Sequence, residues 1–251
     1  MSDLIAAQRE KFSDPYLTAD GQPRAQVPLV ALRTLWFCTG TLCNLECGNC
    51  YIESSPSNDR LVYLTLDQVE RYLDEIRDLA LPTREIGITG GEPFMNPQII
   101  AILDIALARG FEVLVLTNAM RPMMKLEGPL LALRERFGSR LTLRVSLDHY
   151  RQDLHEDERG PRSWAPALAG LKWLSDEGFR VHVAGRTRWG EDDPSMRRGF
   201  AGLFRRYGIA VDADDPQALV LFPEMVAGSE VPEITTACWD ILGLSPADIM
   251  C

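Results

Sequence analysis

The chain contains 251 residues, 46% hydrophobic and 25% charged, a composition typical of a globular protein with a full core. Acidic residues outnumber basic ones by 36 to 26, and the net charge of −10 disfavours a surface that tracks nucleic-acid phosphates. No apolar stretch approaches the roughly 20 residues that cross a bilayer, and no signal-peptide pattern opens the chain, so we expect a cytoplasmic protein without a membrane segment.

Three cysteines follow the first predicted strand. Residues 1–28 are polar and broken by prolines, which predicts an N-terminal extension, and residues 29–37 predict a strand. Cys43, Cys47 and Cys50 then lie in one loop at intervals of four and three. Thiolates at this spacing can face one compact metal centre, and in a chain of this size metal binding is a better explanation for the cysteines than disulfide bonds.

Strand and helix patterns alternate along the rest of the chain. Thr65 and Gln68 form a capping-box pattern before a helix with one apolar face. Further strands are expected at residues 85–89, 111–117, 141–147, 180–184 and 218–222, and further helices at 97–109, 129–137, 163–177 and 193–207. This alternation predicts a parallel sheet with right-handed crossovers. About six units are too few for an eight-stranded barrel, which favours an open, partial (β/α)6 barrel over the alternative, a flat doubly wound sheet.

The second predicted strand ends in a glycine-rich turn. Gly90 and Gly91 allow the backbone to approach a ligand closely, and Glu92 supplies a carboxylate that can hold an ammonium group. Ligands of parallel barrels lie at the C-terminal ends of the strands, where this turn and the cysteine loop are both expected. A simple strand-to-helix turn is the alternative explanation for these residues.

Polar residues also end the next three predicted strands. Asn118 follows the third strand, where it can contact a ligand or form a turn. Ser146 and Asp148 end the fourth and point to the same side, because side chains alternate along a strand. Arg186 follows the fifth, and its guanidinium can clamp a carboxylate with two parallel hydrogen bonds.

The pattern C-x3-C-x2-C of Cys43, Cys47 and Cys50, together with the G-G-E-P sequence at residues 90–93, resembles the signature of the radical S-adenosylmethionine (SAM) superfamily. The resemblance implies a [4Fe-4S] cluster held by the three cysteines, with one iron left open to chelate SAM. It implies reductive cleavage of SAM to a 5′-deoxyadenosyl radical, which takes hydrogen from a substrate. In that family the G-G-E-P motif binds the methionine amino group.

The resemblance also implies roles for other strand-end residues. Asn118 would face SAM or substrate, Ser146 and Asp148 would contact the ribose and methionine, and Arg186 would clamp the SAM carboxylate. The family usually has an aromatic residue before its third cysteine, where this chain has Asn49, so Tyr51 is the candidate for the adenine contact.

Three further features bear on the branch of the family and on the remaining cysteines. His155, with the arginine and glycine of residues 159–160, resembles a stretch found in peptide-modifying members, although a surface histidine in a loop explains it equally well. Cys38, at the end of the first strand, is expected to be a buried thiol. Cys238 and the terminal Cys251 are either structural or ligands of a second iron–sulfur cluster, as in SPASM and twitch extensions.

The expected protein is therefore a radical SAM enzyme that acts on an unidentified peptide or small metabolite and receives its electron from a donor such as flavodoxin or ferredoxin. Its expected domains are the extension at residues 1–28, a core at 29–225 and a C-terminal segment at 226–251. The alternative is a non-catalytic iron–sulfur or zinc-binding module that closes its site with a distant cysteine. Thiol redox catalysis through Cys47 and Cys50 would leave Cys43 unexplained. The pattern identifies no catalytic side chain.

Overall fold

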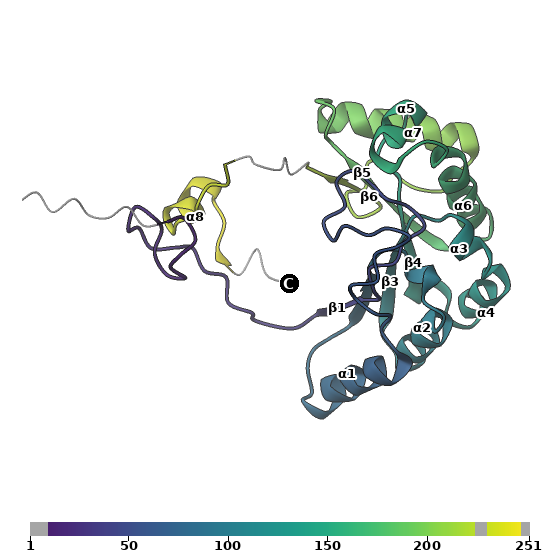
Figure 1. Ribbon diagram of the computed structural model, residues 1–251, viewed down its shortest axis with the longest axis horizontal. Coiled ribbons are helices and arrows are strands. Elements are labelled where there is room, and N and C mark those ends of the chain that lie inside the picture. The colour runs from purple at the N-terminus through teal and green to yellow at the C-terminus, as the bar shows by residue number, and fades with distance from the viewer. Residues whose placement is uncertain (1–9, 224–229, 247–251) are drawn as a thin grey trace, which may run out of the picture. The chain divides into compact units, whose positions relative to one another are not determined.

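The structure of the chain is a computed structural model that describes residues 10–223 and 230–246. Residues 33–223 form one compact unit, and the described residues of both chain ends, 10–32 and 230–246, form a second (Figure 1). All of the predicted cysteine-loop and strand-end residues belong to the first unit.

The first unit is built on a parallel sheet of six strands, in which strand order follows chain order. The strands are β1 (Thr34–Cys38), β2 (Glu85–Thr89), β3 (Glu112–Thr117), β4 (Leu141–Ser146), β5 (Arg180–Arg186) and β6 (Leu219–Phe222). Within the described part of the chain no pairing joins β6 to β1, so the sheet is open. The expected α/β fold with an open parallel sheet is confirmed.

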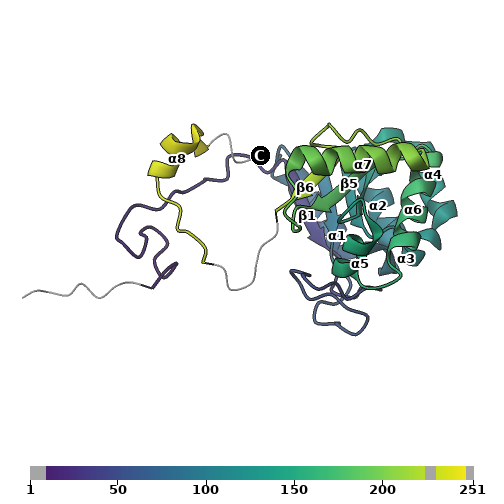
Figure 2. The same cartoon turned by 90° about the horizontal axis from the view of Figure 1, so that it is seen from above.

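Helices cover the outer side of this curved sheet (Figures 1 and 2). They are α1 (Leu66–Asp78), α2 (Ile99–Ala108), α3 (Arg121–Met124), α4 (Glu127–Phe137), α5 (Gln152–Arg159), α6 (Trp164–Asp176) and α7 (Asp193–Tyr207), with short 3-10 turns at Pro93–Met95 and Gly138–Arg140. The four-residue α3 and the two-turn α5 were not expected. Both fall in strand-to-helix connections, where no long apolar period marks them.

Local sequence signals explain where α1 begins and how it packs. Thr65 and Gln68 form both hydrogen bonds of the predicted capping box. Val69, Leu73 and Ile76 are buried against the sheet, as their helical spacing requires. Within the described residues of the first unit, the helices lie on the outer side of the sheet, and alternate residues of the strands line its other face (Figure 1).

The first strand is shorter than predicted. It begins at Thr34, opposite Glu85, because β2 provides no partner for the residues before it, and Leu29 and Val30 are exposed. The expectation that Cys38 is a buried thiol was wrong, since this side chain is exposed. Phe37 faces the helices, so the alternation of the edge strand turns Cys38 toward the open face.

The second unit contains the short helix α8 (Ala237–Leu242) and is organised by one carboxylate. Glu233 accepts hydrogen bonds from the backbone of Phe12 at 2.9 Å and of Ala19 at 2.6 Å, and it pairs with Arg24. Residues from both ends of the chain therefore form this unit together. None of the helices in the described ranges is both long enough and apolar enough to span a membrane.

Candidate functional site

The three loop cysteines are free thiols near the carboxyl end of β1. Cys43 is buried, whereas Cys47 and Cys50 are half-buried. The backbone N–H of Leu45 donates to the Cys43 sulfur at 3.4 Å, and that of Ser54 donates to the Cys50 sulfur at 3.2 Å. Backbone donors to sulfur are a usual means of tuning cluster thiolates, so the loop has the chemistry that an iron–sulfur centre needs.

The electrostatics of the loop favour a bound cation. Burial raises the pKa of the Cys43 thiol to about 11. Burial also raises the pKa of Cys47, while Arg159 opposes the rise. Thiolate formation therefore requires positive charge at the site, which a metal centre supplies.

The three thiols do not form a site for a single ion. Among the described residues, no three His, Cys, Asp or Glu side chains converge closely enough to hold one metal ion. An iron–sulfur cluster is the other centre that cysteine thiolates hold, and in a four-iron cube each thiolate binds a different iron.

The predicted glycine turn is packed against the segment that leads into the cysteine loop. Gly91 donates to the Gly40 carbonyl at 2.9 Å, and Glu92 donates through its backbone to the Leu42 carbonyl at 3.1 Å. A Cβ on Gly91 would lie 2.2 Å from the Leu42 oxygen, and Gly90 has a φ of 139°. The close approach that these glycines permit is therefore to the chain's own backbone, and it ties the end of β2 to the cysteine loop.

Glu92 is buried beneath this turn. Its carboxylate accepts hydrogen bonds from the Thr117 hydroxyl at 2.9 Å and from the backbone of Asn118 at 2.8 Å and Phe94 at 3.2 Å. Burial raises the pKa of Glu92 to about 7, although these bonds and nearby Arg159 lower it. The three donors fix the carboxyl group in place, and its protonation changes in the neutral range.

Asn118 connects the end of β3 to the cysteine loop. Its side-chain oxygen accepts from the Met120 backbone at 3.1 Å, and its nitrogen donates to the Asn44 side chain at 2.9 Å and lies 3.9 Å from the Cys43 sulfur. Ala119, the next residue, takes the left-handed φ of 57°. Asn118 therefore forms the predicted turn and also contacts the cysteine loop, whereas its contact with a ligand stays a prediction.

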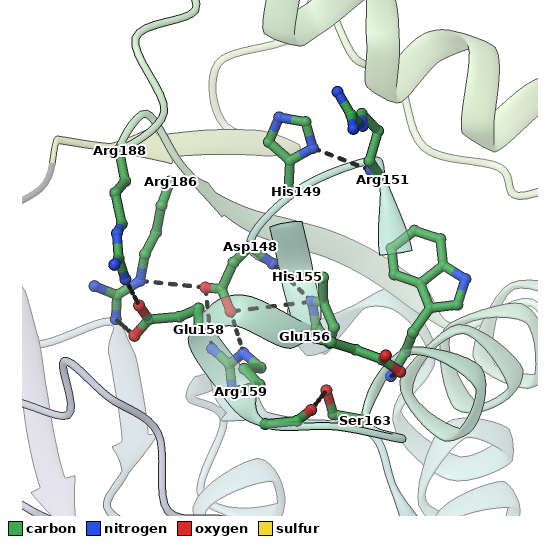
Figure 3. Close-up of polar contacts among 12 residues, drawn as sticks. Asp148, His149, Arg151, His155, Glu156, Glu158, Arg159, Ser163, Arg186 and Arg188 are labelled. Carbon is green, nitrogen blue, oxygen red and sulfur yellow. Dashed lines mark hydrogen bonds and ion pairs between the residues drawn. The ribbon is translucent and has the colours of Figure 1, made fainter. Parts of the chain in front are cut away.

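Asp148 is the centre of a buried charge network (Figure 3). It is 2% exposed, pairs with Arg159 and accepts from Arg186 Nε at 3.2 Å. Burial pushes the pKa of Asp148 up, but the two guanidinium groups outweigh it and the pKa is lowered. The predicted residues Asp148 and Arg186 are therefore brought together and contact each other.

His155 is buried in α5, so the alternative of a surface histidine in a loop was wrong. Its Nδ1 accepts from the Asp148 backbone at 3.3 Å, and its ring packs edge-on against Trp164 with centroids 5.5 Å apart. Burial, with help from Arg159, lowers the pKa of His155 to about 4, which keeps the ring neutral. The His155 ring lies beside Asp148 and accepts from its backbone (Figure 3).

Glu158 anchors the cysteine loop and was missed by the sequence analysis. Its fully buried carboxylate accepts from the Asn49 backbone at 3.1 Å and from Arg188 Nη1 at 2.7 Å, while its carbonyl accepts from Gly48 at 3.0 Å. Arg186 lies 3.9 Å away (Figure 3). The one available signal was Asn49, which replaces the family's usual aromatic residue and binds Glu158 with its side chain at 3.4 Å.

The remaining predicted residues differ in their surroundings. Ser146 is half-buried at the last position of β4, and Tyr51 is 78% exposed beside the cysteine loop. Cys238 is half-buried in the second unit, 3.8 Å from the Thr235 hydroxyl. Cys251 lies outside the described residues.

An open parallel sheet whose carboxyl edge carries three free thiols, a buried carboxyl group and a buried charge network defines the class of α/β proteins that bind a cofactor at their strand ends. Comparison with known families identifies which one. The model of the radical SAM superfamily matches residues 38–187, and the chain belongs to this superfamily. Membership implies SAM and a [4Fe-4S] cluster, and the related proteins of the family are enzymes.

Several known proteins are similar to parts of the chain. The antilisterial bacteriocin subtilosin biosynthesis protein AlbA of Bacillus subtilis is 36% identical over 143 residues, which are 57% of this chain and 30% of AlbA. The mycofactocin maturase MftC of Mycobacterium ulcerans is 30% identical over 67% of this chain and 43% of MftC. The chain thus spans less than half the length of these relatives. The crystal structure of Streptococcus suis SuiB bound to S-adenosylmethionine shares the fold, with a TM-score of 0.60 and 16% identity over 85% of this chain and 45% of SuiB.

Proposed function

We propose that this chain reductively cleaves SAM at a [4Fe-4S] cluster held by Cys43, Cys47 and Cys50, and that the 5′-deoxyadenosyl radical so formed abstracts hydrogen from a peptide substrate. The observation that supports the proposal is the pair of backbone hydrogen bonds between the Glu92 turn and the segment that leads into the free-thiol loop, since they hold a buried carboxyl group close to the three thiols.

The chain's own residues position the cofactor in this proposal. Glu92 binds the SAM ammonium group, because it is a preorganised carboxylate next to the loop. Asp148 and Arg186 contact the ribose and the carboxylate, Ser146 lines the same side, and the exposed Tyr51 contacts the adenine. Burial of the network excludes water from the radical.

A peptide substrate is favoured by the relatives. AlbA is a bacteriocin biosynthesis protein, MftC is a maturase, and SuiB, with a TM-score of 0.56 to this chain, has been crystallised bound to its precursor peptide SuiA. Other relatives include a GTP 3′,8-cyclase, so a small metabolite is the second candidate. The electron is proposed to come from a donor such as flavodoxin or ferredoxin.

The decisive test is anaerobic reconstitution with iron and sulfide, followed by addition of dithionite and SAM. About four irons per chain and formation of 5′-deoxyadenosine are expected, and both are lost in Cys47→Ala, which removes a proposed ligand. Cys38→Ala is the matched control, because Cys38 is a free, exposed thiol outside the loop, and it should keep both.

Other outcomes of that test decide between the alternatives. Tightly held zinc, or a cluster that never cleaves SAM, would replace the proposal with a non-catalytic binding module. Iron well above four per chain that falls in Cys238→Ala would assign Cys238 and Cys251 to a second cluster.

SAM affinity is expected to increase with pH. The pKa of Glu92 is raised to about 7, so the carboxyl group is protonated below that pH and cannot balance the ammonium charge. Between its ordinary pKa and about 7, the folded chain retains a proton that the unfolded chain has released, and stability without SAM therefore falls as pH rises. The dissociation constant of SAM, measured on reconstituted protein, should decrease about tenfold from about pH 6 to 8. Glu92→Gln should abolish this dependence, and an unchanged slope in that variant would contradict the assignment.

A further inference from the structure

The face of the sheet away from the helices carries a cation and a histidine on neighbouring strands. Leu143 and Val145 of β4 are fully buried against the helices, so the side chain of Arg144 points to the opposite face. The same alternation in β5 places His182 on that face, and the register sets it opposite Arg144. Neither residue belongs to the network around Asp148.

The guanidinium of Arg144 is incompletely satisfied. Its Nη2 lies 3.5 Å from His182 Nδ1, whereas its Nε is buried and has no hydrogen-bond partner. Across residues 10–223 and 230–246 no carboxylate forms an ion pair with Arg144. Burial lowers the pKa of Arg144, because holding the charged form out of water is unfavourable.

Glu85, a carboxylate on the same face, does not neutralise this charge by pairing with it. Glu85 of β2 acts on Arg144 through its charge, but its oxygen is 3.3 Å from the Thr34 hydroxyl and it makes no pair with the guanidinium. Buried polar groups in native proteins are normally paired, and a half-buried guanidinium is stabilised when an anion takes its free fork.

We propose that Arg144, oriented by His182, is a substrate-recognition site that binds a carboxylate group, as carried by a glutamate or aspartate side chain of a peptide. The inference rests on the proposed function, because it concerns the substrate of that reaction. It adds a specificity-determining residue and a chemical class of substrate to it.

The local charge favours a carboxylate over a phosphate. Burial and the charges of Arg144 and Arg180 lower the pKa of His182, so the ring is neutral near pH 7 and Arg144 is the charged group that contacts it. A single guanidinium matches the single charge and planar shape of a carboxylate. A phosphate dianion would also face the negative charge of Glu85.

The position of Arg144 suits a substrate that reaches the cofactor. Arg144 precedes Asp148 by four residues. At the rise of a β-strand it therefore lies about 13 Å from Asp148 along the strand direction, farther from the carboxyl ends of the strands. A substrate held there by its carboxylate extends toward the strand ends, where the cysteine loop lies. On the same face, at the β1 edge of the sheet, Trp36 is 45% exposed and lies against Gly87.

The test uses the reconstituted enzyme with SAM and two pools of end-blocked pentapeptides, one with glutamate and one with glutamine at the centre and both with random flanks. Retention of each pool is measured by mass spectrometry. The glutamate pool should be retained about tenfold more strongly, and Arg144→Gln should remove the preference. Arg144→Lys, which keeps the charge but not the fork, should retain part of it. Variants are compared at equal iron content, so that a loss of folded, reconstituted protein is not mistaken for a loss of peptide binding.

Arg180→Gln is the matched control. Arg180 is an exposed arginine of β5 opposite Thr142, nearer the amino ends of the strands, and its loss changes the net charge equally. Arg180→Gln should preserve the preference for the glutamate pool. An equal loss of this preference in Arg180→Gln and Arg144→Gln would contradict the proposed site and indicate a general effect of charge.

Two more outcomes complete the test. Competition by glutarate that depends on Arg144, without peptide binding, supports the carboxylate site and assigns it to a small metabolite. Equal retention of both pools with no glutarate binding overturns the inference. Formation of 5′-deoxyadenosine by the same wild-type sample separates that result from failure of the proposed function, which would abolish SAM cleavage whichever pool is present.

Discussion

Replacing Glu158 with alanine is expected to lower the free energy of unfolding by about 3 kcal/mol or more and to reduce the iron content after reconstitution. The Glu158 side chain is fully buried and holds Asn49 and Arg188 together. Its loss leaves the partly buried Arg188 guanidinium with only the exposed Asp157 as an ion-pair partner and frees the loop between Cys47 and Cys50. Denaturant unfolding of the protein before reconstitution and an iron count after it measure the two effects separately.

The neighbouring residue provides the control for this experiment. Asp157 also lies 3.6 Å from Arg188, but its side chain is 52% exposed, so Asp157→Ala should change both quantities little. Glu158→Gln keeps the shape and part of the hydrogen bonding and should fall between wild type and Glu158→Ala. Full iron content in Glu158→Ala would show that the loop holds its shape without this anchor.

Replacing Asp148 with asparagine is expected to cost about 3–5 kcal/mol of stability, because it removes the negative charge from a buried group that two arginines share. Arg159 and Arg186 both bind this carboxylate, and an amide would turn hydrogen-bond donors toward one of them. SAM binding should weaken as well, since Arg186 loses the contact that orients it. Chemical denaturation and SAM titration measure these changes.

The pH dependence of stability provides a second measurement of Asp148. Its pKa is lowered in the folded chain, so its contribution is complete above the ordinary carboxyl pKa of about 4 and is lost as pH falls from there toward the folded pKa. The wild type should therefore lose stability in this acidic window more steeply than Asp148→Asn. Asp153→Asn, which alters an exposed pair with Arg151, should follow the wild type. Parallel wild-type and Asp148→Asn curves would contradict the assignment.

Short-range patterns in the sequence determined the fold class. The period of apolar residues predicted all six strands, with β2 at its observed bounds, and the capping box marked the start of α1 at Leu66. The residues that make up each of these patterns lie close together in the sequence, so the patterns can be recognised without information about the rest of the chain. The ends of β1 and the helix α5 were not predicted, because their limits depend on which strand or loop lies beside them.

The candidate site also has features that the sequence predicts and features that it does not. The cysteine spacing, the Glu92 turn and the polar residues at strand ends are readable from the sequence, since parallel strands bring their carboxyl ends to one edge. The hydrogen-bond and ion-pair partners of these residues cannot be predicted from the sequence, because each pair joins segments that are far apart in the chain.

Asn49 and Glu158 are 109 residues apart, and no local pattern relates them. Arg144 illustrates the same limit from the opposite side. Alternation alone places its side chain on one face of β4, but only the packed structure reveals that no carboxylate among the described residues pairs with it. The sequence therefore determined the fold class and the family of the chemistry. Tertiary structure decided which described charges have an ion-pair partner and which do not, because pairing depends on distances across the assembled sheet.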